Sequence, residues 1–89
     1  MPIQYTERFV KQYERLPKTI QRKVDKALRL LDADFRHPCL RSHPVEGEEG
    51  TEAVFEASVD AKYRMTFQRH GDVLLMRNVD NHDECLKNP

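Results

Sequence analysis

Three side chains of this 89-residue chain have the chemistry that a proton-transferring or phosphate-binding site needs. His43 and His82 stand in polar segments, and Arg64 stands in a stretch that alternates apolar and polar residues. Histidine suits either acid or base catalysis because its unperturbed pKa lies near neutrality. Arginine stays charged, and its planar fork can bind two oxygens of a phosphate. These residue types predict a site that binds phosphate and moves protons, provided that the fold brings them together.

Each of these side chains also has an ordinary structural explanation. His82 could lie on the surface or cap a helix, and His43 stands in a loop immediately before a proline. Arg64 could simply pair across a sheet with Glu56 or with Asp60. The residue types leave both interpretations open, so the elements that position them become decisive.

Three further cations are candidates for binding a substrate. Lys62 and Arg41 could contact a nucleic-acid backbone or be ordinary surface charges. Arg77 interrupts an apolar run, where it could be a second phosphate ligand or an ion-pair partner. The formal net charge is zero, with 15 basic and 15 acidic residues. Bulk charge therefore gives nucleic-acid binding no support, and the argument depends on where these cations lie.

No metal site and no cofactor are predicted. The possible metal ligands form no paired motif of the CxxC or HxxxH kind; they are His37, Cys39, His43, His82 and Cys85. A nucleophilic pair made of Cys85 and His82 is a weaker alternative, because both would lie on one short turn. The chain shows no secretory segment and no apolar run of membrane-spanning length. We therefore expect a cytoplasmic protein whose cysteines are free thiols.

Two helices are predicted after a short first strand. Thr6 is a suitable N-cap for a helix whose apolar residues recur at helical spacing up to Leu16. Pro17 separates that helix from the next and suits the first position of the second helix. The second helix has an amphipathic stripe formed by Ile20, Val24, Ala27, Leu28 and Leu31. The pair is expected to form an αα-hairpin.

Alternating apolar and polar residues predict four strands. They cover residues 2–6, 53–60 and 62–68 and, after the turn His70-Gly71-Asp72, residues 73–79. The last run is almost continuously apolar, which is typical of an inner strand covered on both sides. Residues 39–51 are expected to form loops, and a short helical turn should follow Asp80. The order predicts one α+β domain over residues 1–89. In it, the N-terminal strand and the αα-hairpin pack on one face of a twisted, mostly antiparallel four-stranded sheet.

The parity of the third strand predicts where the site lies. If Tyr63, Met65 and Phe67 face the helices, the intervening side chains point to the other, uncovered face; these are Lys62, Arg64, Thr66 and Gln68. The loop that holds Arg41 and His43 and the loop that holds His82 should border this row. A concave basic and polar site is therefore expected there.

The helix pair and the segments that follow it resemble the RelE/ParE superfamily, the small toxins of type II toxin–antitoxin systems. The segments are RSHPVEG at residues 41–47, FEASVDAKYRMTF at 55–67 and GDVLLMRNVDNHDE at 71–84. The resemblance covers nearly the whole chain and is greatest for YafQ-like and RelE-like members, which cut messenger RNA in the ribosomal A site. It implies attack of a ribose 2′-hydroxyl on the adjacent phosphate, without metal. It also implies a cognate antitoxin, the ribosome and mRNA as partners, and leaves the oligomeric state open.

The resemblance assigns roles to the three residues introduced first. His43 and His82 match catalytic histidines of the YafQ-like group, and Arg64 matches an arginine of RelE. Cleavage by a 2′-hydroxyl needs a base, a cation at the phosphorane and an acid for the leaving oxygen, which two histidines and an arginine can supply.

The chain also departs from the family pattern. The strand at residues 55–58 lacks the lysines of RelE. Where the YafQ-like pattern has a histidine, an aspartate and an aromatic residue, this chain has Ser58, Lys62 and Leu86.

Two other functions remain open. A ParE-like relative would inhibit gyrase without cutting RNA. Because ParE-like proteins need no histidine pair, a loss of toxicity on changing His82 would favour the nuclease. A degenerate, non-toxic member would only bind an antitoxin. The acidic residues between Glu46 and Glu56 and the missing lysines keep that third interpretation open.

Overall fold

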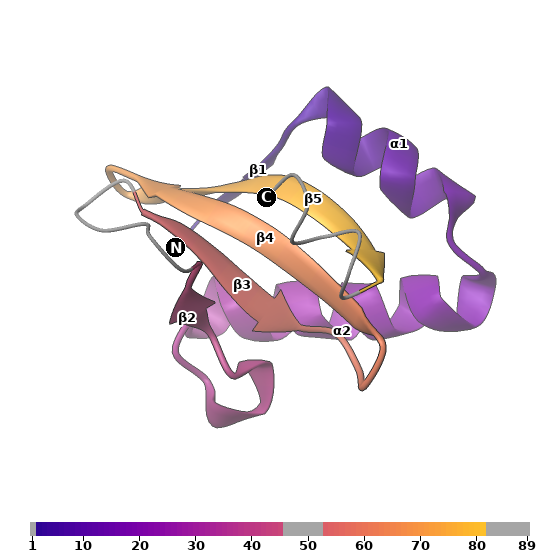
Figure 1. Cartoon of the computed structure of the whole chain (residues 1–89). Coiled ribbons are helices and arrows are strands. Elements are labelled where there is room, and N and C mark those ends of the chain that lie inside the picture. Colours follow the sequence, from indigo (N-terminus) through magenta and orange to yellow (C-terminus); the bar gives the residue numbers. More distant parts are fainter. Residues whose placement is uncertain (1, 46–52, 82–89) are drawn as a thin grey trace.

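The computed structural model describes residues 2–45 and 53–81. Strand β1 (Ile3–Tyr5) leads into helices α1 (Glu7–Arg15) and α2 (Lys18–Ala33), and a short 3₁₀ helix, Pro38–Leu40, follows. The chain continues through β2 (His43–Pro44), β3 (Val54–Ser58), β4 (Tyr63–His70) and β5 (Val73–Asn81). In Figure 1, α2 runs across one face of the twisted sheet, and α1 lies beside β5.

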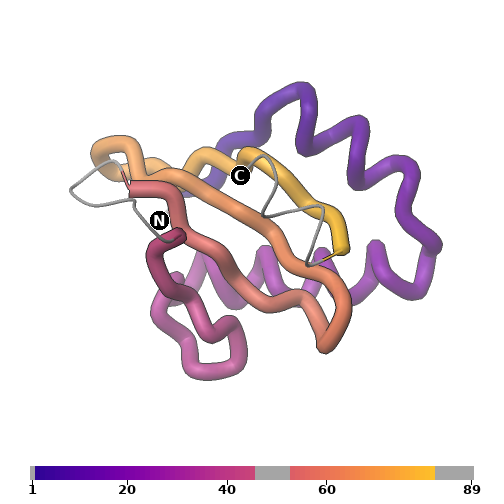
Figure 2. Tube along the Cα trace, in the orientation of Figure 1, coloured from indigo at the N-terminus to yellow at the C-terminus, as the bar shows by residue number. Residues whose placement is uncertain are grey.

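The strands form one sheet in the order β1-β5-β4-β3-β2. β1 is parallel to β5, and the other neighbours are antiparallel. The first and last described strands therefore lie side by side although they are far apart in sequence (Figure 2). The predicted α+β class is confirmed. The sheet has five strands rather than the predicted four, because His43 and Pro44 pair with Glu56 and Phe55 of β3.

The helix boundaries follow from local hydrogen bonding. The side chain of Thr6 accepts a hydrogen bond from the backbone N–H of Phe9 and donates one to the carbonyl of Met76 on β5. This N-cap therefore both starts α1 and ties it to the sheet. Pro17 immediately precedes α2, where its carbonyl accepts from the N–H groups of Ile20 and Gln21. Pro17 thus separates the helices as predicted, but it caps the second helix instead of occupying its first position.

The core lies between the helices and one face of the sheet. Met65 and Phe67 of β4 are fully buried, as their strand parity predicts, and Tyr63 is half-buried. The other members of the core are Phe9, Val24, Ala27, Leu31, Leu40, Ala57, Leu74, Met76 and Val79. Each large side chain in this set contributes about 1.5–3 kcal/mol by leaving water. The core therefore fixes which face of β4 carries Arg64.

The turn between β4 and β5 has the predicted chemistry. Gly71 has a φ of 59°, in the left-handed region that glycine adopts without steric cost. Further along this strand pair, Phe67 lies opposite Met76 whereas Thr66 lies opposite Asn78. Arg77 is therefore an extra residue in β5, a β-bulge. The bulge lets Met76 and Val79 both face the core and places Asn78 opposite Thr66 on the other face.

Candidate functional site

Three adjacent strands contribute to one charged cluster. Glu56 lies on β3, His43 lies opposite it on β2, and Arg64 belongs to β4 on the other side. His43 Nε2 and Arg64 Nε each lie 3.7 Å from the same atom, Oε1 of Glu56. Two of the three residues first singled out in the sequence therefore meet at a single carboxylate. Their catalytic roles stay predictions.

His43 is held on the edge of the sheet with its ring exposed. Its Nδ1 lies 2.8 Å from the carbonyl oxygen of Arg41. A carbonyl oxygen can only accept, so Nδ1 must carry the hydrogen, and in the neutral ring Nε2 keeps its lone pair. The Arg41 backbone is left-handed, with a φ of 50°, at the end of the 3₁₀ helix. This local turn therefore sets the tautomer of His43 and turns its basic nitrogen toward Glu56.

Arg64 is held by the end of its own strand. Its Nη1 donates to the backbone carbonyls of Asp60 and Tyr63, and its Nε faces Glu56. The side chain is 18% exposed, so it is partly withdrawn from water. The guanidinium has a second terminal nitrogen, Nη2, with two further donors. The pairing with Glu56 that a purely structural arginine would make is therefore present.

Asp60 organises the connection that holds Arg64. Its Oδ1 accepts from the backbone N–H groups of Lys62 and Tyr63 at 2.8 and 2.7 Å, and its Oδ2 lies 3.2 Å from Nζ of Lys23 on α2. Burial alone would raise the pKa of Asp60. The hydrogen bonds from Tyr63 and Lys62, together with the Lys23 ammonium, outweigh burial and lower that pKa below its ordinary value. The ionised carboxylate thus stabilises the β3–β4 connection.

We expect Asp60→Asn to lower the free energy of unfolding by about 1–2 kcal/mol at neutral pH, because two hydrogen bonds to a charged acceptor are weakened. The folded pKa lies below the unfolded value of about 3.9, so this contribution is complete above that pH and disappears as pH falls through the folded pKa. Urea denaturation at pH 7 and pH 3 should therefore show a gap in unfolding free energy between wild type and variant that is smaller at pH 3. Asp72→Asn, an exposed turn residue, is the control. An equal gap at both pH values would contradict the assignment.

The face of the sheet away from the helices is polar, but it is not open at its centre. Glu56, Thr66 and Asn78 lie opposite one another across β3, β4 and β5, and all three are buried. The prediction of an uncovered row is therefore wrong at Thr66. Sequence reasoning also missed Glu56 as a site residue, because an acidic residue in a strand is usually solvated. The only indication in the sequence that Glu56 is buried is its position between the apolar residues Phe55 and Ala57.

The other predicted ligands do not converge on this cluster. Arg77 donates from Nη1 to Oε1 of Gln68 at 2.8 Å, whereas Arg64 lies opposite Asp80. Lys62 is exposed on the β3–β4 connection, and Arg41 holds His43 through its backbone carbonyl. Lys62 and Arg41 are therefore exposed surface cations that are close to Arg64 and His43 in sequence.

Some predictions fall on residues that the structure does not describe. His82, Cys85, Leu86 and the expected last helical turn lie outside residues 2–45 and 53–81. Within those ranges, no three histidine, cysteine or acidic side chains gather closely enough to hold a metal ion. In the same ranges, no helix combines the length and the apolar character needed to cross a membrane.

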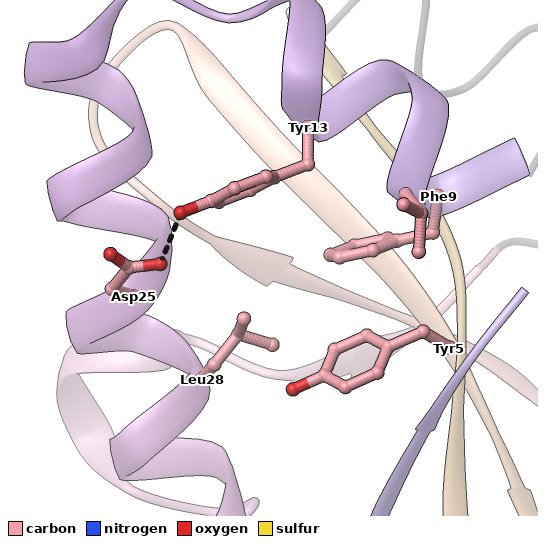
Figure 3. Close-up of a pocket in the computed structure, with 6 residues that line it drawn as sticks. Tyr5, Phe9, Tyr13, Asp25 and Leu28 are labelled. Atoms are coloured by element: carbon pink, nitrogen blue, oxygen red, sulfur yellow. Dashed lines mark hydrogen bonds between the residues drawn. The ribbon is translucent and has the colours of Figure 1, made fainter. Parts of the chain in front are cut away.

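An apolar pocket of about 240 Å³ lies between α1, α2 and β1. Tyr5, Phe9 and Leu28 line it (Figure 3), and Tyr5 and Val10 are the large apolar residues of the described chain that stay exposed. At its rim the Tyr13 hydroxyl donates to Oδ1 of Asp25 at 2.7 Å, and this hydrogen bond raises the pKa of Tyr13. The helical spacing of apolar residues does not show which of them line this partly exposed pocket and which lie in the core.

No family model and no curated protein matches the sequence. Solved structures do match its fold. A chain of the Escherichia coli DinJ–YafQ toxin–antitoxin complex aligns with a TM-score of 0.74 and 16% identity over 92% of both chains. The archaeal RelE–RelB complex from Pyrococcus horikoshii OT3 aligns at 0.74 and 18% identity, covering 90% of this chain and 92% of the other. The YoeB/ParE toxin from Agrobacterium tumefaciens aligns at 0.71 and 18% identity, covering 92% and 99%. The chain therefore has the fold of the RelE/ParE toxins, as its resemblance to YafQ-like and RelE-like members implied.

Proposed function

We propose that this protein is the toxin of a type II toxin–antitoxin system and acts as a ribosome-dependent mRNA endonuclease in the cytoplasm. The observation that carries the proposal is the meeting of His43 and Arg64 at one oxygen of Glu56. A titratable nitrogen on β2 and a fixed cation on β4, the two strands that flank β3, supply two of the three groups that in-line cleavage of a phosphodiester requires. The likeness to toxin chains supports the proposal at the level of the fold.

The reaction begins at the ribose. Nε2 of His43 takes the proton of the 2′-hydroxyl while that oxygen forms a bond to the adjacent phosphorus. Arg64 donates from Nη2 to the phosphate oxygens, where negative charge increases in the phosphorane. The bond from phosphorus to the 5′-oxygen then breaks, and His82 gives the leaving oxygen its proton. The products are a 2′,3′-cyclic phosphate and a free 5′-hydroxyl.

Binding to the ribosome must depend on local positive charge, because the net charge of the chain is zero. Lys62 and Arg41 are exposed, lie close in sequence to Arg64 and His43, and can contact RNA phosphates. The bulge residue Arg77 is the third proposed substrate ligand. Since phosphate contacts carry no sequence information, these cations position the RNA without selecting a codon.

The partner that silences the toxin would be a cognate antitoxin. The structures that match the fold include the toxin–antitoxin complexes DinJ–YafQ and RelE–RelB. An amphipathic helix or extended segment of such a protein would wrap the helix pair and a sheet edge. Exposed Tyr5 and Val10 on the helix side give an apolar contact of the kind that this partner would cover.

Reconstituted translation tests the proposed activity directly. We expect purified protein to cut an mRNA positioned on ribosomes and to leave the same mRNA intact when ribosomes are omitted, because the chain has little net charge with which to hold free RNA. Primer extension should map discrete ends that carry a 5′-hydroxyl. Intact mRNA in both arms, with DNA-damage signalling in induced cells, would instead indicate gyrase inhibition.

A further inference from the structure

Glu56 is the buried acid that the proposed reaction leaves without a role. It lies in the middle of β3 and is 2% exposed. A buried carboxylate is unfavourable unless cations and hydrogen bonds compensate for the lost water, and an apolar residue at such a position is often at least as stable. Val54, two residues earlier on the same face, is apolar and buried. Stability of the sheet therefore gives no reason for an acid at position 56.

The position of Glu56 between His43 and Arg64 gives a different reason for an acid here. A single atom, Oε1, lies 3.7 Å from both His43 Nε2 and Arg64 Nε. These two nitrogens therefore lie no further apart than twice that distance, with the carboxylate between them. The backbone holds each residue from its other side, through the Arg41 carbonyl for His43 and through the Asp60 and Tyr63 carbonyls for Arg64.

We propose that Glu56 is a positioning residue that fixes the His43 imidazole and the Arg64 guanidinium relative to each other for the RNA reaction, an inference that rests on the proposed function. Glu56 itself is too buried to touch RNA. It acts on Arg64 by holding Nε, which directs Nη2 toward the phosphate. It acts on His43 by placing a negative charge beside Nε2, where the proton from the 2′-hydroxyl arrives. Neither proton nor bond passes through Glu56.

The competing explanation is that Glu56 only neutralises Arg64 within the fold. The two explanations differ in what an isosteric, neutral replacement does. A purely structural Glu56 would make Glu56→Gln less stable without changing the cleavage step of the folded fraction. A positioning Glu56 would make the cleavage step slow in protein that is fully folded, because small displacements of reacting groups are costly.

The test compares Glu56→Gln and Glu56→Asp with Glu14→Gln, the same chemical change at an exposed position of α1. NMR of the free protein measures hydrogen exchange of the Arg64 Nε–H group. Single-turnover assays on ribosome-bound mRNA measure the cleavage rate constant and its dependence on toxin concentration. We expect Glu56→Gln to speed that exchange, because the carboxylate beside Nε is lost, and to slow cleavage by about ten- to a hundredfold, with half-saturation unchanged. Glu56→Asp should restore part of the rate because it keeps the charge.

The effect of Glu56→Gln on the cleavage rate should vanish when Arg64 is absent. In an Arg64→Ala background, Glu56→Gln should change the residual cleavage less than threefold, since residues that act as a unit are not additive. Glu56→Gln that folds, cleaves and exchanges like Glu14→Gln overturns the inference, and so does a variant that is less stable but cleaves at the wild-type rate. If wild type never cuts ribosome-bound mRNA, the proposed function fails, and Nε–H exchange alone then decides whether Glu56 positions Arg64. Should Glu56→Gln not fold, Glu56→Asp carries both readouts.

Discussion

Replacing Arg64 with alanine is expected to lower cleavage of ribosome-bound mRNA by at least a hundredfold and to relieve growth arrest in cells that make the protein. A fixed donor aimed at developing charge contributes about 2.7–4 kcal/mol to the barrier in comparable sites, which corresponds to a rate factor of about a hundred to a thousand. Single-turnover cleavage and colony counts after induction measure the two effects. Wild-type cleavage and arrest by a folded Arg64→Ala protein would remove Arg64 from the site.

The Arg64→Ala experiment must distinguish a loss of catalysis from a loss of folding, because Arg64 also pairs with Glu56 and hydrogen-bonds to the β3–β4 connection. Removing the cation leaves a buried carboxylate, so thermal unfolding of each variant has to be recorded. Arg64→Lys keeps the charge but loses the planar fork, and we expect it to fold yet cleave at least tenfold more slowly. Arg8→Ala, on the exposed side of α1, should leave cleavage unchanged.

His43→Gln is expected to slow cleavage by about a hundred- to ten-thousandfold, the usual range for loss of a general acid or base. Stability should change by less than about 0.5 kcal/mol, because the ring is on an edge strand and 58% exposed. A large loss of cleavage rate with an unchanged melting curve would therefore show that His43 acts in the cleavage step and not in folding. The measurement is single-turnover cleavage at saturating toxin, combined with thermal denaturation.

His70→Gln provides the matched control, since His70 is an exposed histidine at the far end of β4. His82→Ala should behave like His43→Gln if His82 protonates the leaving oxygen. The double variant should then be little slower than the worse single one. If His43→Gln cleaves as fast as His70→Gln, another group must take the 2′-hydroxyl proton.

The comparisons show how little sequence identity this fold needs. Identities of 16% and 18% accompany TM-scores of 0.74 over about nine-tenths of the chains. A core tolerates extensive substitution as long as apolar residues of suitable size keep their pattern. Here the helix stripe with Val24 and Leu31 packs on alternate strand residues such as Met65 and Phe67. Pattern preserves the architecture, whereas activity depends on the individual side chains that the architecture presents.

Much of the fold was determined by the sequence itself. The Thr6 N-cap, the break at Pro17 and the glycine turn at Gly71 each depend on residues within a few positions, so local chemistry predicts them. The two side-chain periods likewise predict which face of α2 and of β4 packs in the core. The candidates His43 and Arg64 could be chosen from their chemistry and from the family resemblance alone.

Tertiary structure decided the rest, because it depends on contacts between distant residues. A two-residue strand has no period to detect, so pairing of His43 with β3 became visible only in the sheet. The bulge at Arg77 reverses the parity of β5 and puts Asn78 rather than Val79 on the polar face. The same register buries Glu56 and sets its carboxylate between an imidazole and a guanidinium. A one-dimensional pattern gives the type of each side chain, but only the pairing of strands gives its neighbours.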